Sequence, residues 1–207
     1  HRSVMSAIHS PLHGEVATMS FDRLSLHILI LIALLAGGCA SAPFESPRGL
    51  DSSELPIDLE RFMGDWYVVA HMPTGAEKNA YEALEIYALR DDGKIDIRYH
   101  FCDGGLDGKA KELTMTGRVE DATTNAAWRV QPWWPLSLEY RVLELDADYQ
   151  TTVIGHPSGK YAWIMARQPD LPDTEIDAIT TRLSERGYET ANMRRVPHAD
   201  GACRATL

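Results

Sequence analysis

Gly64-Asp65-Trp66-Tyr67 opens the first clear strand of the chain, directly after Asp58-Leu59-Glu60-Arg61-Phe62-Met63. The glycine lets the chain turn sharply out of a helical turn into a strand. Trp66 supplies the largest available side chain, which suits the closed end of a β-barrel. A tryptophan in the core of a β-sandwich would leave the same short pattern, so the residues that pair with it further along the chain decide between the two.

Short alternating or β-branched runs recur about every ten residues after Gly64, with turn signals between them, and this spacing is typical of an all-β barrel or sandwich. Asp91-Asp92-Gly93 and Asp146-Ala147-Asp148 are short enough for hairpins, so neighbouring strands should pair antiparallel in chain order. The eight predicted strands are Trp66–Met72, Tyr81–Leu89, Lys94–Phe101, Glu112–Val119, Ala127–Gln131, Leu138–Leu145, Tyr149–Gly155 and Lys160–Arg167.

Alternation of apolar and polar side chains gives these strands two different faces. It is clearest in Lys94–Phe101, where isoleucine, tyrosine and phenylalanine alternate with aspartate, arginine and histidine. A closed barrel with an apolar interior requires this pattern, because each strand faces the lumen on one side and solvent on the other.

After the eighth strand the spacing of apolar residues changes from that of a strand to that of a helix. Ile176, Ile179 and Leu183 fall at positions i, i+3 and i+7, and Gly187 supplies a C-terminal stop. The acidic polar face of this helix argues against a helix lying on a membrane. We therefore expect residues 58–207 to form one domain, an eight-stranded antiparallel up-and-down barrel with one C-terminal α-helix packed outside.

The beginning of the chain is typical of a targeting signal. Leu24–Ala36 is an almost unbroken apolar run followed by Gly37-Gly38-Cys39. It is too short to span a bilayer core, which needs roughly 20 apolar residues; a buried helix is the alternative. Small residues before a cysteine resemble the bacterial lipoprotein signal, in which the cysteine becomes the lipidated N-terminus, although Ala36 stands where leucine is usual.

We expect translation to begin at Met19, residues 1–38 to be an upstream segment and signal peptide, and residues 39–57 to be the lipidated N-terminus and a flexible tether rich in serine and proline. Cleavage before Cys39 removes 38 of the 207 residues and leaves 169, enough for one domain. The formal net charge of −10 argues against nucleic acid and against a purely electrostatic membrane contact. Membrane attachment would then come from the lipid on Cys39.

Cys102 and Cys203 remain in the mature chain, in an oxidising compartment. We expect a disulfide between them, which would close a loop of about 100 residues. Two unrelated free thiols are the alternative.

Three motifs, in the correct order along the chain, resemble the lipocalin family. They are Gly64-x-Trp66 on the first strand, Asp148-Tyr149 in the turn before the seventh strand, and Arg167 at the end of the eighth. In the family the basic residue lies across the first-strand tryptophan. A guanidinium over an indole is worth roughly 0.5–2 kcal/mol, and here it would join the first strand to the last.

The wider stretch from Asp58 to Pro197 resembles the bacterial outer-membrane lipocalin lipoproteins and the apolipoprotein D branch. This resemblance implies a cup closed at the Trp66 end that carries a fatty acid, lysophospholipid or similar hydrophobic molecule. The protein would be anchored in the outer membrane with its domain facing the periplasm; a homodimer is left open. A link from the end of the third strand to the C-terminal tail recurs in the family, which supports pairing of Cys102 with Cys203.

Strand parity with Trp66 and Arg167 predicts which residues line the lumen: Val68, Ile97, Tyr99, Met115, Tyr140, Val142, Trp163 and Met165. Burying acyl methylenes at roughly 0.8 kcal/mol each would drive binding without any catalytic group. The alternative is that these side chains fill a solid core, which eight strands permit.

The connection after the fifth predicted strand, Gln131-Pro132-Trp133-Trp134-Pro135, should lie at the open rim. Two adjacent tryptophans cannot both point into a core, so at least one should lie at the surface. We include Trp133 and Trp134 among the candidate ligand-binding residues and expect one of them to gate the cup or touch the membrane. A self-packed loop is the alternative.

Two other classes of function stay open. A free Cys102 near the mouth could act on a bound lipid as a thiolate, or the barrel could be a ligand-free envelope protein that contacts partners. The histidines His71, His100, His156 and His198 are widely spaced, so no metal is expected. We expect no catalytic residues and no cofactor.

Overall fold

The computed structural model describes residues 56–199 and 203. The elements, in chain order, are α2 (Leu59–Phe62), β1 (Gly64–Met72), β2 (Ala80–Leu89), β3 (Ile95–Asp103), β4 (Lys109–Val119), β5 (Ala127–Trp133), β6 (Leu136–Leu145), β7 (Thr151–Gly155), β8 (Ala162–Ala166), α3 (Asp173–Glu185), the 3₁₀ helix η1 (Thr190–Asn192) and β9 (Arg194–Arg195). The predicted signal peptide, lipidated Cys39 and all but the end of the tether lie outside the described residues. No helix among the described residues is long and apolar enough to cross a membrane.

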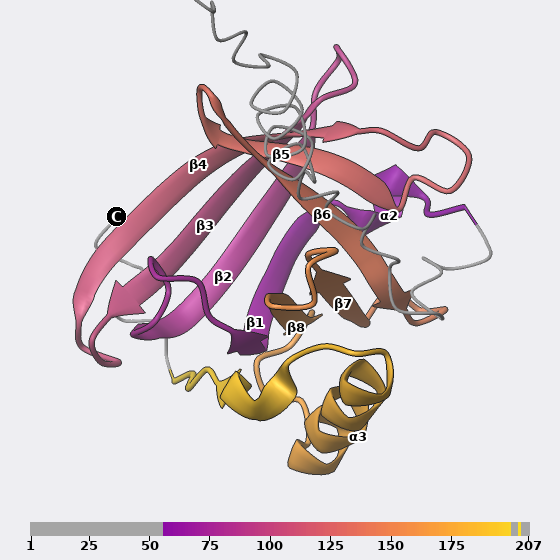
Figure 1. Ribbon diagram of the computed structural model, residues 1–207. Coiled ribbons are helices and arrows are strands. Elements are labelled where there is room, and N and C mark those ends of the chain that lie inside the picture. Colours follow the sequence, from indigo (N-terminus) through magenta and orange to yellow (C-terminus); the bar gives the residue numbers. More distant parts are fainter. Residues whose placement is uncertain (1–55, 200–202, 204–207) are drawn as a thin grey trace, which may run out of the picture. The chain divides into compact units, whose positions relative to one another are not determined.

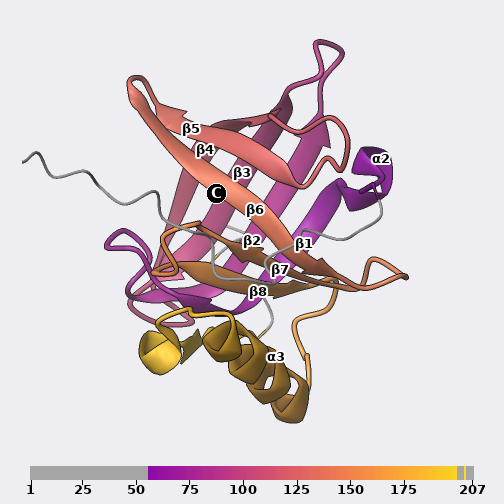
Figure 2. The same ribbon diagram turned by 45° about the vertical axis from the view of Figure 1, so that its right-hand side comes forward.

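The strands β1 to β8 close into one antiparallel barrel (Figures 1 and 2). Each strand pairs with its neighbours in the chain, and β1 pairs with both β2 and β8, which closes the barrel. The predicted all-β fold and its up-and-down strand order are therefore confirmed.

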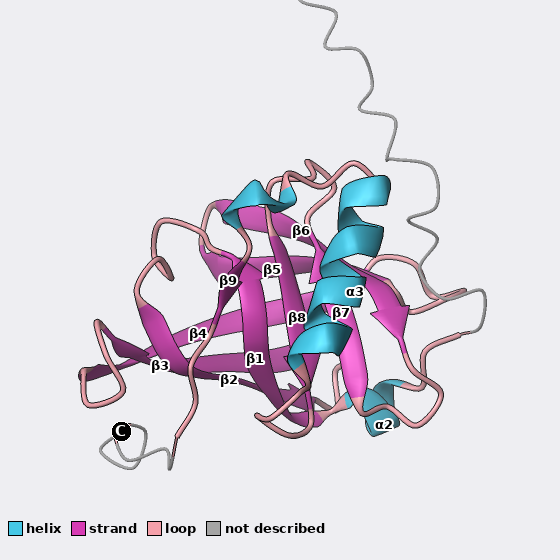
Figure 3. Ribbon diagram, turned by 90° about the horizontal axis from the view of Figure 1, so that it is seen from below, coloured by secondary structure: helices cyan, strands magenta, loops and turns pink. Residues whose placement is uncertain are grey.

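The ninth strand was not predicted from the sequence. β9 lies beside β1, with Arg194 opposite His71 and Arg195 opposite Ala70, as Figure 3 shows from below. It occupies the edge that β1 exposes beyond Tyr67, where β1 and β2 no longer pair. Two residues are too few to leave an alternating pattern, which is why the sequence does not reveal this strand.

The β5–β6 hairpin is tighter than expected. Trp133 pairs with Leu136, so the predicted connection of residues 131–135 shortens to Trp134-Pro135, joined by a cis peptide bond. The strands continue past an irregularity in register between Val130 and Trp133 to the tip of the hairpin, and both tryptophans lie at this end of the barrel.

The helix α3 packs on the outside of the barrel, as predicted (Figures 2 and 3). Its residues Ile176, Ile179 and Leu183 are buried in an apolar cluster with the outward side chains of β1, β6, β7 and β8. The helix ends where Gly187 adopts a φ of +87°, a conformation that favours glycine. Tyr188 N donates to Leu183 O and Gly187 N donates to Ser184 O, a Schellman cap.

One end of the barrel is filled by aromatic side chains, here called the closed-end cluster: Phe62, Trp66, Tyr87, Trp128 and Tyr140. Phe62 lies 5.2 Å from Trp66 and 5.4 Å from Trp128, and Trp128 stacks on Tyr140 at 5.0 Å, all measured between ring centres. The Trp66 indole donates to Phe62 O at 2.8 Å. The barrel is therefore sealed beside α2, and a ligand would have to enter from the opposite end.

Candidate functional site

Arg167 lies over Trp66 at the closed end, the contact that the sequence predicts. Its guanidinium carbon is 3.8 Å from the centre of the Trp66 ring. Its Nη atoms also donate to Asp65 O, to the carbonyls of Arg61 and Phe62 in α2 and to that of the C-cap residue Met63, at 2.7–3.2 Å. One side chain after β8 thus satisfies the free carbonyls at the end of α2 and holds them against β1.

Tyr149, the second residue of the acidic–aromatic motif, also fixes α2. Its hydroxyl accepts a hydrogen bond from Asp58 N at 2.9 Å, and the Arg61 guanidinium stacks on its ring at 4.0 Å. The carboxylate that builds this turn is that of Asp146 rather than Asp148, because Asp146 accepts from the backbone N–H groups of Asp148, Gln150 and Thr151. These motifs stabilise the closed end of the barrel.

The structure gathers the eight predicted lumen residues in the barrel interior. Val68, Ile97, Tyr99, Val142 and Met165 are buried in one cluster, and Met115, Tyr140 and Trp163 pack against it. Two hollows of about 550 and 520 Å³ lie elsewhere, one on the outer face of β4 and β5 and one at the rim near the β1–β2 connection. Neither is lined by any of these eight residues, so ligand binding by them stays a prediction.

Trp133 and Trp134 do not join the interior. They are 64% and 83% exposed at the tip of the β5–β6 hairpin. Leu136 and Leu138, which follow on β6, are also exposed, so the inward apolar face of this strand begins only at Tyr140. An exposed apolar tip of this kind is typical of a contact surface. Contact with a ligand or a membrane stays a prediction.

Sequence reasoning missed a buried carboxyl group inside the barrel. Glu85 lies on β2 opposite Trp66, only 7% exposed, with Tyr87 O–H donating to it. The Tyr87 and Tyr140 hydroxyls are 2.7 Å apart. Burial, reinforced by nearby Glu77, raises the pKa of Glu85 to about 8. The position of Glu85 two residues before Tyr87 could have revealed this buried carboxyl group, because residues two apart in a strand lie on the same face.

A second buried carboxyl group is that of Glu77, which belongs to the β1–β2 connection. It accepts from Thr74 N at 3.2 Å and from Thr74 Oγ1 at 3.1 Å, and His71 Nδ1 is 4.0 Å away. Burial raises the pKa of Glu77, and its contacts with Thr74 and Trp163 only partly offset this. Burial, and then the charge of Arg194, lowers the pKa of His71 to about 4, so this imidazole is neutral at pH 7.

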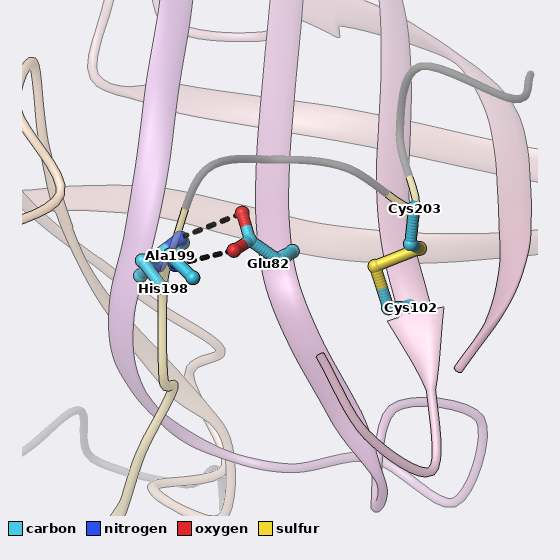
Figure 4. The surroundings of a disulfide bond; sticks show 5 residues. All are labelled: Glu82, Cys102, His198, Ala199 and Cys203. Carbon is cyan, nitrogen blue, oxygen red and sulfur yellow. Dashed lines mark hydrogen bonds and ion pairs between the residues drawn. A yellow bond between two sulfur atoms is a disulfide. The ribbon is translucent and has the colours of Figure 1, made fainter. Parts of the chain in front are cut away.

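Cys102 and Cys203 form a disulfide, which confirms the predicted pair. Figure 4 shows that the same tail is also held by β2: the carboxylate of Glu82 accepts a hydrogen bond from Ala199 N and lies 3.8 Å from His198 Nδ1. Because Cys102 is bonded, it offers no thiolate for the chemistry considered above. Among residues 56–199 and 203, no group of three or more His, Cys, Asp and Glu side chains could hold a metal ion.

A closed antiparallel barrel with one sealed end, an apolar interior and an outer helix defines a class of small β-barrels that carry ligands inside. A family model described as a lipocalin-like domain matches residues 57–198. The chain belongs to the lipocalin family, whose members bind small hydrophobic ligands.

Known proteins resemble the chain over most of its length. It is 31% identical to the outer membrane lipoprotein Blc of Escherichia coli K12, over 78% of this chain and 89% of that protein. It is 27% identical to temperature-induced lipocalin-1 of Arabidopsis thaliana, over 70% and 81% respectively. The fold matches insecticyanin from the tobacco hornworm Manduca sexta with a TM-score of 0.54 and 17% identity, over 72% of this chain and 85% of that one.

Proposed function

We propose that this protein is a lipid-anchored carrier that binds a fatty acid, a lysophospholipid or a similar amphiphile inside its barrel at the cell envelope. The observation that carries the proposal is the apolar interior cluster above the closed end, in a chain of the lipocalin family. Each acyl methylene transferred from water to such an interior contributes roughly 0.8 kcal/mol. Micromolar binding would then require only part of a long acyl chain to be buried after the cost of association is met.

The envelope location rests on the sequence and on the relatives. Leu24–Ala36 followed by Cys39 is typical of a lipoprotein signal. The relatives from Escherichia coli and Vibrio cholerae are named outer membrane lipoproteins. In this proposal Cys39 carries the lipid, and the barrel faces the periplasm.

A matched pair of substitutions on β4 tests the proposal. Met115 packs against the interior cluster, whereas its neighbour Thr114 is exposed on the outer face. Met115→Trp should fill the lumen and lower the affinity for radiolabelled lysophosphatidylcholine by about tenfold or more, which is about 1.4 kcal/mol. Thr114→Trp adds the same side chain outside and should leave the affinity unchanged.

Circular dichroism melting would show that both variants fold. Failure of the native protein to bind lysophosphatidylcholine or oleate would contradict the proposal and favour a barrel that contacts partners without a ligand. Equal binding by the Met115→Trp and Thr114→Trp variants would place the ligand outside the lumen.

A further inference from the structure

Two acidic side chains, Glu85 and Glu77, lie inside a barrel whose proposed cargo is hydrophobic. They are 7% and 8% exposed. Neither forms an ion pair with a lysine or arginine of the described residues, and the imidazole 4.0 Å from Glu77, that of His71, is neutral at pH 7. Burying a carboxyl group without a cation costs stability, whereas an apolar residue at Glu85 would simply extend the apolar interior. The stability of the empty barrel therefore does not explain why these two acids are buried.

The hydroxyl of Tyr99 lies in the same region without a hydrogen-bond partner. Tyr99 is 1% exposed and pairs across the strands with Glu85. Burial, and then the charges of Glu77 and Glu85, raise the pKa of Tyr99 well above 10, so its hydroxyl keeps its proton. A buried hydroxyl left unpaired costs stability, and it supplies an acceptor for a donor that enters the barrel.

These groups match the needs of one kind of head group. A primary ammonium carries three donors and a positive charge. Glu85 offers a carboxylate, Tyr99 an unpaired hydroxyl oxygen, and Tyr87 and Tyr140 further hydroxyl oxygens. Trp66, which lies opposite Glu85 on β1, and the other rings of the closed-end cluster would add cation–π attraction.

We propose that the barrel contains a cation site in which Glu85 and Tyr99 receive the ammonium group of an amphiphilic amine, whose alkyl chain lies along the apolar wall towards the rim. The inference rests on the lumen-binding function proposed above and narrows it to one class of ligand. Glu77, on the β1–β2 connection nearer the rim, adds a second carboxyl group on the path of the cation. The mature chain's acidic surface, with a net charge of −10, favours approach of the same ligand.

Proton release accompanies this binding. The pKa of Glu85 is about 8, so the group is mostly protonated at pH 7 and gives up its proton when the ammonium arrives. The other groups that face Glu85 are Glu77, whose pKa is also raised, the hydroxyl of Tyr87, and Tyr99 and Tyr140, whose pKa values burial raises well above 10. Further towards the rim lie neutral His71 and Arg194, which donates to Ala80 O. Amine affinity should therefore rise between pH 6 and 8.

The test compares decylamine, decanol and decanoate, which share one alkyl chain and differ in charge. Each is titrated calorimetrically into the full-length protein in lipid nanodiscs, with empty nanodiscs as the blank. At pH 7 the native protein should bind decylamine on the order of tenfold more tightly than decanol, as a charge-assisted hydrogen bond predicts. The heat of decylamine binding should differ between phosphate and Tris buffers by the release of about one proton, expected for a group with a pKa above the working pH.

Glu85→Gln keeps the shape of the side chain and removes its charge. It should bring the ratio of decylamine to decanol affinity close to one and abolish proton release, and Tyr99→Phe should lower the ratio to a smaller extent. Glu139 is half-exposed on the outer face of β6, so Glu139→Gln removes the same charge outside the barrel. This variant should change neither the ratio of decylamine to decanol affinity nor the release of the proton. Tyr99→Phe provides a second variant if Glu85→Gln does not fold.

Two results separate failure of this inference from failure of the proposed function. Binding of decanol with no preference for decylamine, or with a preference for decanoate, would overturn the cation site and leave the carrier function standing. Binding of none of the three ligands would overturn both.

Discussion

Arg167 and Trp66, 101 residues apart in the chain, form a stacked pair in which the guanidinium carbon is 3.8 Å from the centre of the indole ring. The same guanidinium donates to the backbone oxygens of Arg61, Phe62, Met63 and Asp65. This pair closes the barrel at one end, because it ties the chain after β8 to β1 and to α2. The open end, and any ligand route, must therefore lie at the other end.

Arg167→Ala should lower the free energy of unfolding by about 2–3 kcal/mol, because it removes the cation–π contact and the hydrogen bonds to the carbonyl groups of Arg61 and Met63. Arg167→Lys should fall between the native protein and the alanine variant, since an ammonium cannot reach all these oxygens from one position. Urea unfolding measures both. Arg90→Ala, which removes an exposed arginine, is the control. If Arg167→Ala and Arg90→Ala unfold at the same urea concentration, the pair does not stabilise the barrel.

The disulfide between Cys102 and Cys203 should stabilise the barrel by about 2–4 kcal/mol, because it closes a long loop in the unfolded chain. Replacing both cysteines by serine should lower the urea midpoint accordingly, and reduction of the native protein with dithiothreitol should have the same effect. Reduction should not shift the double variant. A thiol titration that finds Cys102 and Cys203 reactive in the folded protein would contradict the disulfide. It would favour the alternative in which Cys102 acts on a bound lipid as a thiolate.

Stability should fall as the pH rises from 6.5 to 8. Glu85 has a pKa of about 8 in the folded protein, above its ordinary value of 4.5, so in this range the folded state binds a proton that the unfolded state has lost. Glu77 acts in the same direction. His71, with its pKa lowered to about 4, opposes them only below pH 6.5, where the unfolded imidazole takes up a proton.

Urea unfolding of the native protein and of Glu85→Gln across pH 6–9 measures this dependence. The glutamine variant should lose most of the slope between pH 6.5 and 8, because its side chain does not titrate. The same slope in both proteins would show that Glu85 is already ionised at pH 6.5.

The tryptophans at the tip of the β5–β6 hairpin should matter for transfer and hardly for stability. They are 64% and 83% exposed, so replacing both Trp133 and Trp134 by alanine should change the free energy of unfolding by about 0.5 kcal/mol or less. The double variant should transfer a fluorescent lysophospholipid to vesicles several-fold more slowly, since aromatic rings favour the bilayer interface. Leu106→Ala, at an exposed leucine of the β3–β4 connection, is the control. Equal transfer rates for all three proteins would leave the hairpin without a role in lipid exchange.

Most of the fold could be predicted because its signals are local. The alternation in β3 and the helical spacing of Ile176, Ile179 and Leu183 each follow from one face being buried. The contact of Arg167 with Trp66 came from a family resemblance, since nothing in the spacing of two residues so far apart shows that they meet.

The two interior carboxyl groups were not predicted, for different reasons. Glu85 lies at an inward position of β2, two residues from Tyr87. A charged residue at such a position interrupts the apolar pattern, so the sequence does not indicate that it is buried. Glu77 belongs to a connection, where no period exists to place it. β9 depends on the edge that β1 leaves unpaired, which only the closed barrel reveals.

Native mass spectrometry of the protein purified from membranes tests the carrier proposal most directly. The native protein and Thr114→Trp should each carry one co-purified amphiphile per barrel, released on collisional activation, and Met115→Trp should be empty. A native protein that leaves the membrane with no bound amphiphile, or a Met115→Trp variant that carries as much as Thr114→Trp, would contradict a ligand-binding lumen.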